Sequence, residues 1–298
     1  MSVRFDSLYD AVSSKGHVCV GLDTSIDYVP QAERQKAKND ADAVLNFNKA
    51  LIDATYDVSS CFKVQIAYYE EMGLNGLYAY SETLKYIRSK GCLVIADIKR
   101  SDIADTALRY ARAHFKGDFE ADFVTLNPYL GMDSLEPWLK EAKEANKGAF
   151  VLMRTSNPGM RDFQYLEIDS PKKTKLYNII GEKMSILAKE NTGTKGFGIF
   201  GIVVGCTEKE EASVIRQNCP NLFFLIPGYG AQGGGASDVA LLLKDGNAGV
   251  VNASRSIITA WQKEENSQNA DNIFAAKAAR CATIKMRDEI LSAVGVFK

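Results

Sequence analysis

Eight short apolar runs, rich in β-branched residues, recur along the chain. In order they are HVCVGLD, SCFKVQI, CLVIADIK, FVTLNP, GAFVLMRTS, FGIFGIVVGC, NLFFLIPG and AGVVNASRS. The runs are near-continuously apolar instead of alternating, which is typical of parallel strands that are covered on both faces. Parallel strands need long crossover connections, so this feature restricts the fold to the α/β architectures.

Helix-like stretches lie between these runs. Examples are 41–55, 81–91, 134–148, 175–190, 208–218 and 237–246, and a last helix is predicted over 271–294. Eight strands alternating with helices predict a single (β/α)8 TIM barrel, with a doubly wound parallel sheet as the alternative. No linker, low-complexity tract or internal repeat interrupts the alternation, so we interpret residues 1–298 as one domain. The two longest connections, 24–59 and 157–196, are candidate lids.

The composition excludes several classes of function. A formal net charge of −1 gives no overall field that would attract nucleic acid or an anionic membrane. The chain shows neither a secretory signal nor an apolar run of membrane-spanning length, so we expect a cytoplasmic protein. Six cysteines form no C-x-x-C pair and there are two histidines, so neither a metal site nor a His-centred mechanism is expected.

Polar side chains end most of the predicted strands, where the chemistry of such barrels takes place. They are Asp23, Lys63, Asp97, Lys99, Ser156, Gln232 and Arg255. Strand alternation puts Asp97 and Lys99 on one face, and we expect that face to be the barrel mouth, where Lys63 also arrives.

Asp102 lies in the loop after this strand, so strand pleating does not determine where it points, and a neighbouring subunit is one possible target. A structural salt-bridge cluster is the alternative interpretation of these charges. Because ion pairs in partly buried positions contribute little net stability, we favour a functional role.

A glycine-rich segment, IPGYGAQGGGASD over 226–238, follows the seventh run. Gly228, Gly230 and Gly233 match the dinucleotide pattern G-x-G-x-x-G, but the next strand ends in Asn252 and Arg255 where an acidic ribose ligand is expected. We favour a phosphate site instead, because loops after the last two strands of a barrel commonly bind phosphate through backbone N–H groups. The guanidinium of Arg255 suits bidentate phosphate contact.

The segments GLDTS, FKVQIAYYE, DIKRSDIADTA, RTSNPG and PGYGAQGG, followed by Arg255, resemble the orotidine 5′-phosphate decarboxylase family in its larger bacterial-type branch. The resemblance covers nearly the whole chain, and D-x-K-x-x-D with its I-x-x-T continuation is the most specific part. Ser101 stands where the family often has a glycine, and Tyr229 occupies a variable position of the phosphate-binding loop. Neither is one of the charged residues.

The resemblance implies conversion of orotidine 5′-monophosphate (OMP) to uridine 5′-monophosphate (UMP) and CO₂ without metal or organic cofactor. It assigns catalysis to Lys63, Asp97, Lys99 and Asp102, with Lys99 stabilising and protonating the C6 carbanion. It also implies a homodimer in which the partner supplies Asp102, Ile103 and Thr106 to the site. The implied substrate-binding residues are Asp23, Ile103, Thr106, Ser156, Pro227, Gln232, Gly233, Gly234 and Arg255.

Two alternatives share part of this pattern. A metal-dependent ketose-phosphate decarboxylase or aldolase of the same suprafamily also carries D-x-K-x-x-D, but there an acidic residue joins Asp97 to hold Mg²⁺. Lys63 on the second strand and the RTSNPG segment favour the OMP decarboxylase. A catalytically silent phosphate-binding barrel would keep the phosphate loop but would not need the four charged residues together.

Overall fold

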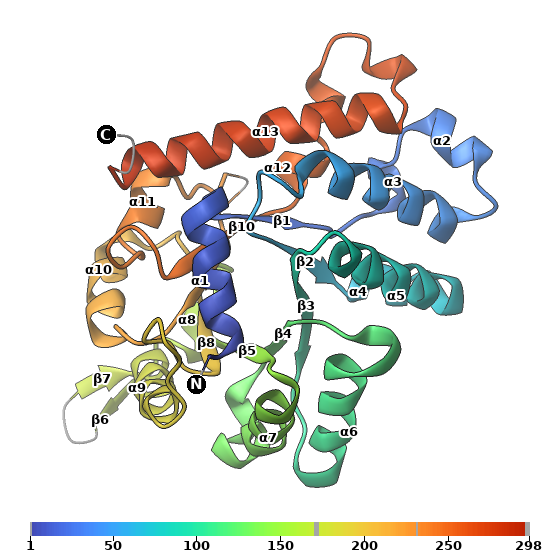
Figure 1. The fold of residues 1–298 in the computed structure, drawn as a ribbon. Coiled ribbons are helices and arrows are strands. Elements are labelled where there is room, and N and C mark those ends of the chain that lie inside the picture. The colour runs from blue at the N-terminus through green and yellow to red at the C-terminus, as the bar shows by residue number, and fades with distance from the viewer. Residues whose placement is uncertain (1, 170–172, 231, 296–298) are drawn as a thin grey trace.

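A closed barrel of eight parallel strands forms the centre of the computed structural model, which describes residues 2–169, 173–230 and 232–295. The strands are β1 (Val18–Gly21), β2 (Cys61–Gln65), β3 (Leu93–Arg100), β4 (Phe123–Leu126), β5 (Gly148–Arg154), β8 (Phe200–Val204), β9 (Phe224–Ile226) and β10 (Gly249–Ala253). Each pairs with its neighbour in this order, and β10 closes on β1. The predicted TIM barrel is confirmed, and each predicted apolar run coincides with one of its strands, although β3 extends one residue beyond its run (Figure 1).

Helices surround the barrel (Figure 1). The longer ones are α1 (Arg4–Lys15), α3 (Asp40–Thr55), α5 (Gly73–Ser89), α6 (Ala104–Phe115), α7 (Glu136–Ala145), α9 (Leu176–Lys189), α10 (Lys209–Asn218) and α13 (Asn272–Ala293). Short helices are α2 (Gln31–Lys36), α4 (Ala67–Glu70), α8 (Met160–Phe163), α11 (Ala236–Ala240) and α12 (Arg255–Ile258). The helix predicted over 237–246 is limited to α11, and the last two residues of the predicted range, Asp245 and Gly246, lie instead in a turn with left-handed backbone conformations.

The amino-terminal end of the barrel is closed by α1. Its Phe5 is fully buried, and the ring centroid lies 4.8 Å from that of Phe123, 5.1 Å from Phe150 and 5.5 Å from Phe223. Such tilted and edge-to-face contacts fill the space between the strand beginnings with apolar surface. The carboxyl ends of the strands are therefore the end at which a cavity can open.

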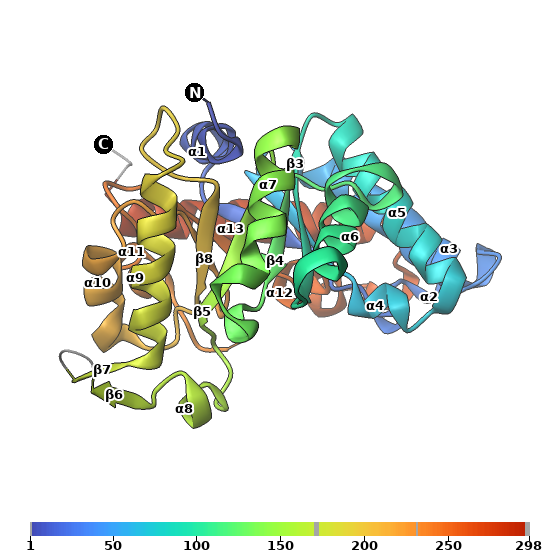
Figure 2. The same ribbon diagram turned by 90° about the horizontal axis from the view of Figure 1, so that it is seen from below.

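An antiparallel hairpin, β6 (Glu167–Asp169) with β7 (Lys173–Lys175), lies within the long connection after β5. Figure 2 shows this hairpin and α8 at the end of the barrel opposite α1. The sequence predicted helices and polar loops here and no strands, because this segment is charged and lacks a β-branched run. The connection therefore extends beside the end of the barrel that carries the strand-end residues.

The structure also addresses the cysteines and the helices. Cys281 is exposed, whereas the other cysteines are buried as free thiols. Within the described ranges, none of the helices combines the length and the apolar character needed to cross a membrane.

Candidate active site

A cavity of about 480 Å³ opens at the carboxyl ends of the strands. Among its lining residues are the sequence-predicted Asp23, Lys63, Asp97, Lys99, Ser156, Pro227, Gln232 and Arg255. These residues come from six segments of the sequence and meet because all the barrel strands are parallel. The structure thus brings these residues together at the predicted end of the barrel, while their function as a site and their individual roles stay predictions.

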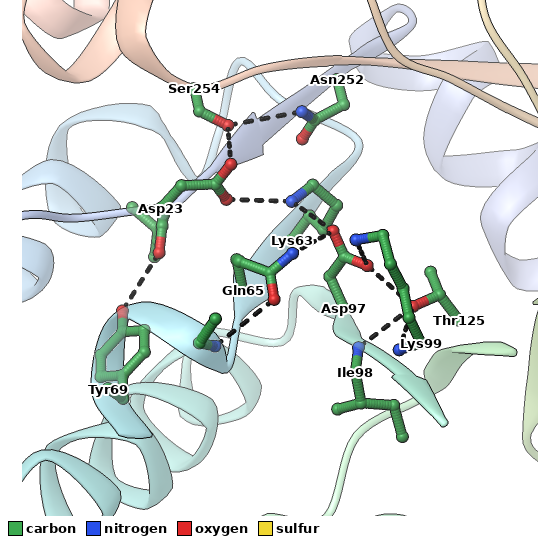
Figure 3. A network of polar contacts seen from close by, with 12 residues as sticks. Asp23, Lys63, Gln65, Tyr69, Asp97, Ile98, Lys99, Thr125, Asn252 and Ser254 are labelled. Carbon is green, nitrogen blue, oxygen red and sulfur yellow. Dashed lines mark hydrogen bonds and ion pairs between the residues drawn. The ribbon is translucent and has the colours of Figure 1, made fainter. Parts of the chain in front are cut away.

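Four charged side chains form a chain of ion pairs along one side of this cavity (Figure 3). Lys63 Nζ lies 2.9 Å from Asp23 Oδ1 and 2.9 Å from Asp97 Oδ2. Lys99 Nζ lies 2.7 Å from Asp97 Oδ1. Negative and positive groups therefore alternate, and the Lys99 ammonium ends the chain.

Burial differs strongly along this chain of ion pairs. The side chains of Lys63 and Asp97 are 6% and 9% exposed, whereas that of Lys99 is 47% exposed. Burial alone would lower the pKa of Lys63, but the Asp23 and Asp97 carboxylates raise it well above its ordinary value. Burial alone would raise the pKa of Asp97, but Lys63 and Lys99 hold it well below its usual range. Lys63 and Asp97 are therefore both ionised at neutral pH.

Lys99 reaches the mouth by a different backbone route from the one that the sequence suggests. Simple alternation along a regular strand would place it beside Asp97, but β3 bulges against β4 between Ala96 and Arg100, and Lys99 has a φ of 45°. Residues other than glycine rarely adopt this left-handed backbone conformation. The predicted meeting of Asp97 and Lys99 is confirmed, although the bulge determines the direction of Lys99.

Neutral polar groups that the sequence did not single out support the carboxylates. Gln65 Nε2 donates to Asp97 Oδ2 at 3.0 Å, and Thr125 Oγ1 donates to Asp97 Oδ1 at 2.7 Å. Ser254 Oγ donates to Asp23 Oδ2 at 2.9 Å. The available signal was weak: each is a neutral polar residue within or just after an apolar run.

The loop after β9 has the backbone conformations that its glycines predict, with φ of 102° at Gly228, 70° at Gly230 and 93° at Gly233. The N–H of Gly233 donates to Gly230 O at 3.0 Å, and that of Gly234 donates to Gly228 O at 3.1 Å. In this conformation these two N–H groups are engaged within the loop, and the two glycines lie outside the cavity lining. Phosphate contact by Gly233 and Gly234 stays a prediction.

Asp102, Ile103 and Thr106 lie outside the cavity of their own chain. The Asp102 carboxylate accepts the N–H of Ile103 at 2.9 Å, and Ile103 and Thr106 are exposed. Within a single chain these residues therefore do not line the cavity that Lys99 lines, and their contribution to a partner's site stays a prediction.

The carboxylates of the site are arranged around an ammonium group. Lys63 lies between Asp23 and Asp97, in the position where a divalent cation would have to bridge them. Within the part of the chain that the structure describes, no three His, Cys, Asp or Glu side chains are grouped as metal ligands would be. The donor set thus fits an internal ion-pair network better than a Mg²⁺ site.

A (β/α)8 barrel with buried charges and a cavity at the carboxyl ends of its strands has the architecture of a barrel enzyme. The chain belongs to the orotidine 5′-phosphate decarboxylase / HUMPS family, whose model matches residues 16–270.

Individual relatives agree with this assignment. The chain is 55% identical over 285 residues to an orotidine 5′-phosphate decarboxylase of Clostridium acetobutylicum, covering 96% of this chain and 98% of that one. It is 53% identical over 286 residues to the enzyme of the same name from Clostridium kluyveri, with 96% of each chain covered. The solved structure of Leishmania donovani OMP decarboxylase matches with a TM-score of 0.74 and 29% identity over 98% of this chain and 99% of that one. These similarities place the chain among the carboxy-lyases.

Proposed function

We propose that this protein decarboxylates orotidine 5′-monophosphate to uridine 5′-monophosphate and CO₂. The observation that carries the proposal is the alternating network of Asp23, Lys63, Asp97 and Lys99, which ends in an ammonium group at the cavity. The names of the relatives support the same reaction.

The chemistry requires a cation next to C6 of the pyrimidine. When the bond between C6 and the carboxylate breaks, its electron pair stays on C6 as a carbanion with almost no resonance stabilisation. The Lys99 ammonium stabilises this charge electrostatically and then transfers a proton to C6. The carbon–carbon bond is replaced by a carbon–hydrogen bond, and Lys99 recovers its proton from solvent.

Asp97 and Lys63 have separate roles in this mechanism. Asp97 accepts from Lys99 at 2.7 Å and so orients the ammonium group. It also lies beside the substrate carboxylate, and their repulsion is relieved as CO₂ leaves. Lys63, which is buried between two carboxylates, stabilises Asp97 in its ionised form.

Binding groups away from C6 hold the rest of the nucleotide. Asp23 and Lys63 contact the ribose hydroxyls, Ser156 and Pro227 the pyrimidine, and Gln232, Gly233, Gly234 and Arg255 the phosphate. Arg255 is exposed at the cavity, with its guanidinium available for an anion. Contacts to the remote phosphate supply binding energy that contributes to lowering the barrier at C6.

The proposal includes a cytoplasmic homodimer of single-domain chains with composite sites, to which the partner contributes Asp102, Ile103 and Thr106. Exposed apolar side chains follow the adjacent strands β3 and β4, namely Ile103 at 51%, Tyr129 at 83% and Leu130 at 47% exposure. Exposed apolar groups that follow two neighbouring strands are suited to burial against a second copy.

The test is the loss of OMP absorbance with purified protein, measured before and after exhaustive EDTA treatment. We expect full activity in both samples and no turnover that this assay can detect with Lys99→Ala. The metal-dependent alternative predicts no turnover of OMP and a chelator-sensitive reaction of a ketose phosphate that Mg²⁺ restores. That result would contradict the proposal.

A further inference from the structure

Thr125 on β4 is fully buried, and it faces the irregular part of β3. Ala96 pairs with Val124 and Arg100 pairs with Leu126, so three residues of β3 lie opposite the single residue Thr125. Regular pairing with β4 carbonyls is lost over this stretch, and the backbone N–H groups there need another acceptor.

The Thr125 hydroxyl provides that acceptor. The N–H groups of Ile98 and Lys99 both donate to Thr125 Oγ1, each at 3.0 Å. The hydroxyl then donates its own proton to Asp97 Oδ1 at 2.7 Å (Figure 3). A hydroxyl has one proton and two lone pairs, so these three hydrogen bonds use its whole capacity.

This one side chain therefore fixes two features of the proposed mechanism. It stabilises the bulge in which Lys99 adopts a φ of 45°, and it orients the carboxylate to which the Lys99 ammonium is bound. We propose that Thr125, which lies in the wall of the cavity, is a positioning residue of the decarboxylation and acts through Asp97 and the Lys99 backbone. The inference rests on the proposed function.

The proposal distinguishes Thr125→Val from Thr125→Ser. Valine has nearly the same shape but leaves the N–H groups of Ile98 and Lys99 without their acceptor and removes one of the two hydrogen bonds that Asp97 Oδ1 accepts, whereas serine keeps the hydroxyl. A displacement of about 1 Å at a reacting group can cost about 100-fold in rate. We therefore expect a decrease of about 100-fold in kcat for Thr125→Val, with KM within about threefold of wild type. Thr125→Ser should stay within about threefold of wild type in both constants.

The experiment measures kcat and KM with OMP for wild type and both variants, each corrected for binding-competent sites by titration with UMP. Amide hydrogen exchange at Ile98 and Lys99 is measured in parallel, and protection should be lost in the valine variant alone. If Thr125→Val does not fold, Thr125→Cys replaces it, because a thiol is a weak donor and acceptor.

Three results would overturn the inference: unchanged kcat in the valine variant, an effect on KM alone, or equal losses for valine and serine. A wild-type protein that does not turn over OMP would instead refute the proposed function, and amide exchange would then decide whether Thr125 holds the bulge.

Discussion

Replacing Lys99 by alanine should separate stability from activity. The Lys99 side chain is 47% exposed and has one ion pair, with Asp97. After its removal Asp97 still accepts from Lys63, Gln65 and Thr125. Partly exposed ion pairs contribute about 1 kcal/mol or less, so the free energy of unfolding should change by about that amount.

The expected loss of activity is much larger. Removing a positioned proton donor costs about 10²–10⁴ in rate, and removing a group that stabilises developing charge costs about 10²–10³. If both effects are lost together, kcat should fall by about 10⁴–10⁷, which corresponds to about 5–10 kcal/mol of transition-state stabilisation. The two magnitudes differ because Lys99 lies at the exposed end of the network, where the structure depends on it least.

The assay combines single-turnover decarboxylation of OMP with urea unfolding and titration with UMP. Lys140→Ala is the matched control, since Lys140 is an exposed lysine on α7 away from the cavity, and it should leave all three measurements unchanged. A folded Lys99→Ala protein that binds UMP and retains a tenth of wild-type turnover would refute the assignment of Lys99 as the proton donor.

Three further predictions follow from the same geometry. Burial would raise the pKa of Asp97, but Lys63 and Lys99 hold it below its usual range. The stability that Asp97 contributes is therefore present above about pH 4 and is lost as the pH falls towards the folded-state pKa. The free energy of unfolding should fall less steeply with acid in Asp97→Asn than in wild type, and an equal slope would contradict the ion pairing. Mixing inactive Lys99→Ala chains with inactive Asp102→Ala chains should restore roughly a quarter of wild-type sites, since about half the dimers are mixed and each has one intact site; no recovery after verified subunit exchange would exclude shared sites. A Cβ on Gly21 would lie 1.9 Å from Ser254 Oγ, so Gly21→Ala should displace Ser254 from Asp23. We expect the fold to be destabilised by about 1–3 kcal/mol, measured by calorimetry, and KM to rise, measured by steady-state kinetics. An unchanged KM would argue against a ribose contact by Asp23.

The fold was largely predictable because the strands of a parallel barrel are buried on both faces. Such strands appear in the sequence as continuous apolar runs, and each of the predicted runs coincides with a barrel strand. The hairpin β6–β7 was not predicted, because its register pairs Glu167 with Lys175 and Asp169 with Lys173 and gives no apolar signal. Helix α1 precedes the first run, so the βα alternation gave no reason to expect it.

The charged part of the site was predictable for a related reason. A charge at the end of an apolar run is conspicuous, as Asp97 and Lys99 are after CLVIA. Gln65 and Thr125 were missed because a neutral polar residue in a strand has no distinctive pattern, and its importance depends on what the adjacent strand places opposite it. The irregular pairing of β3 with β4, which gives Thr125 its partners, cannot be read from either run alone.

The arrangement of the network explains how largely buried charges can lie at the carboxyl ends of the barrel strands. Two carboxylates and two ammonium groups sum to zero, and each buried member contacts at least one group of opposite sign. Removing Lys63 would leave buried Asp97 with Lys99 as its remaining cation and would take from Asp23 the ammonium with which it is paired. The change is costly because burial has removed part of the hydration that would otherwise compensate the carboxylates. The residues follow or lie on the adjacent strands β1, β2 and β3, so the network forms only when these strands pair. Folding of this part of the barrel therefore also assembles the proposed catalytic charges. The exposed Lys99 ammonium is held beside Asp97, and the position of Asp97 is set by the packed strands of the barrel.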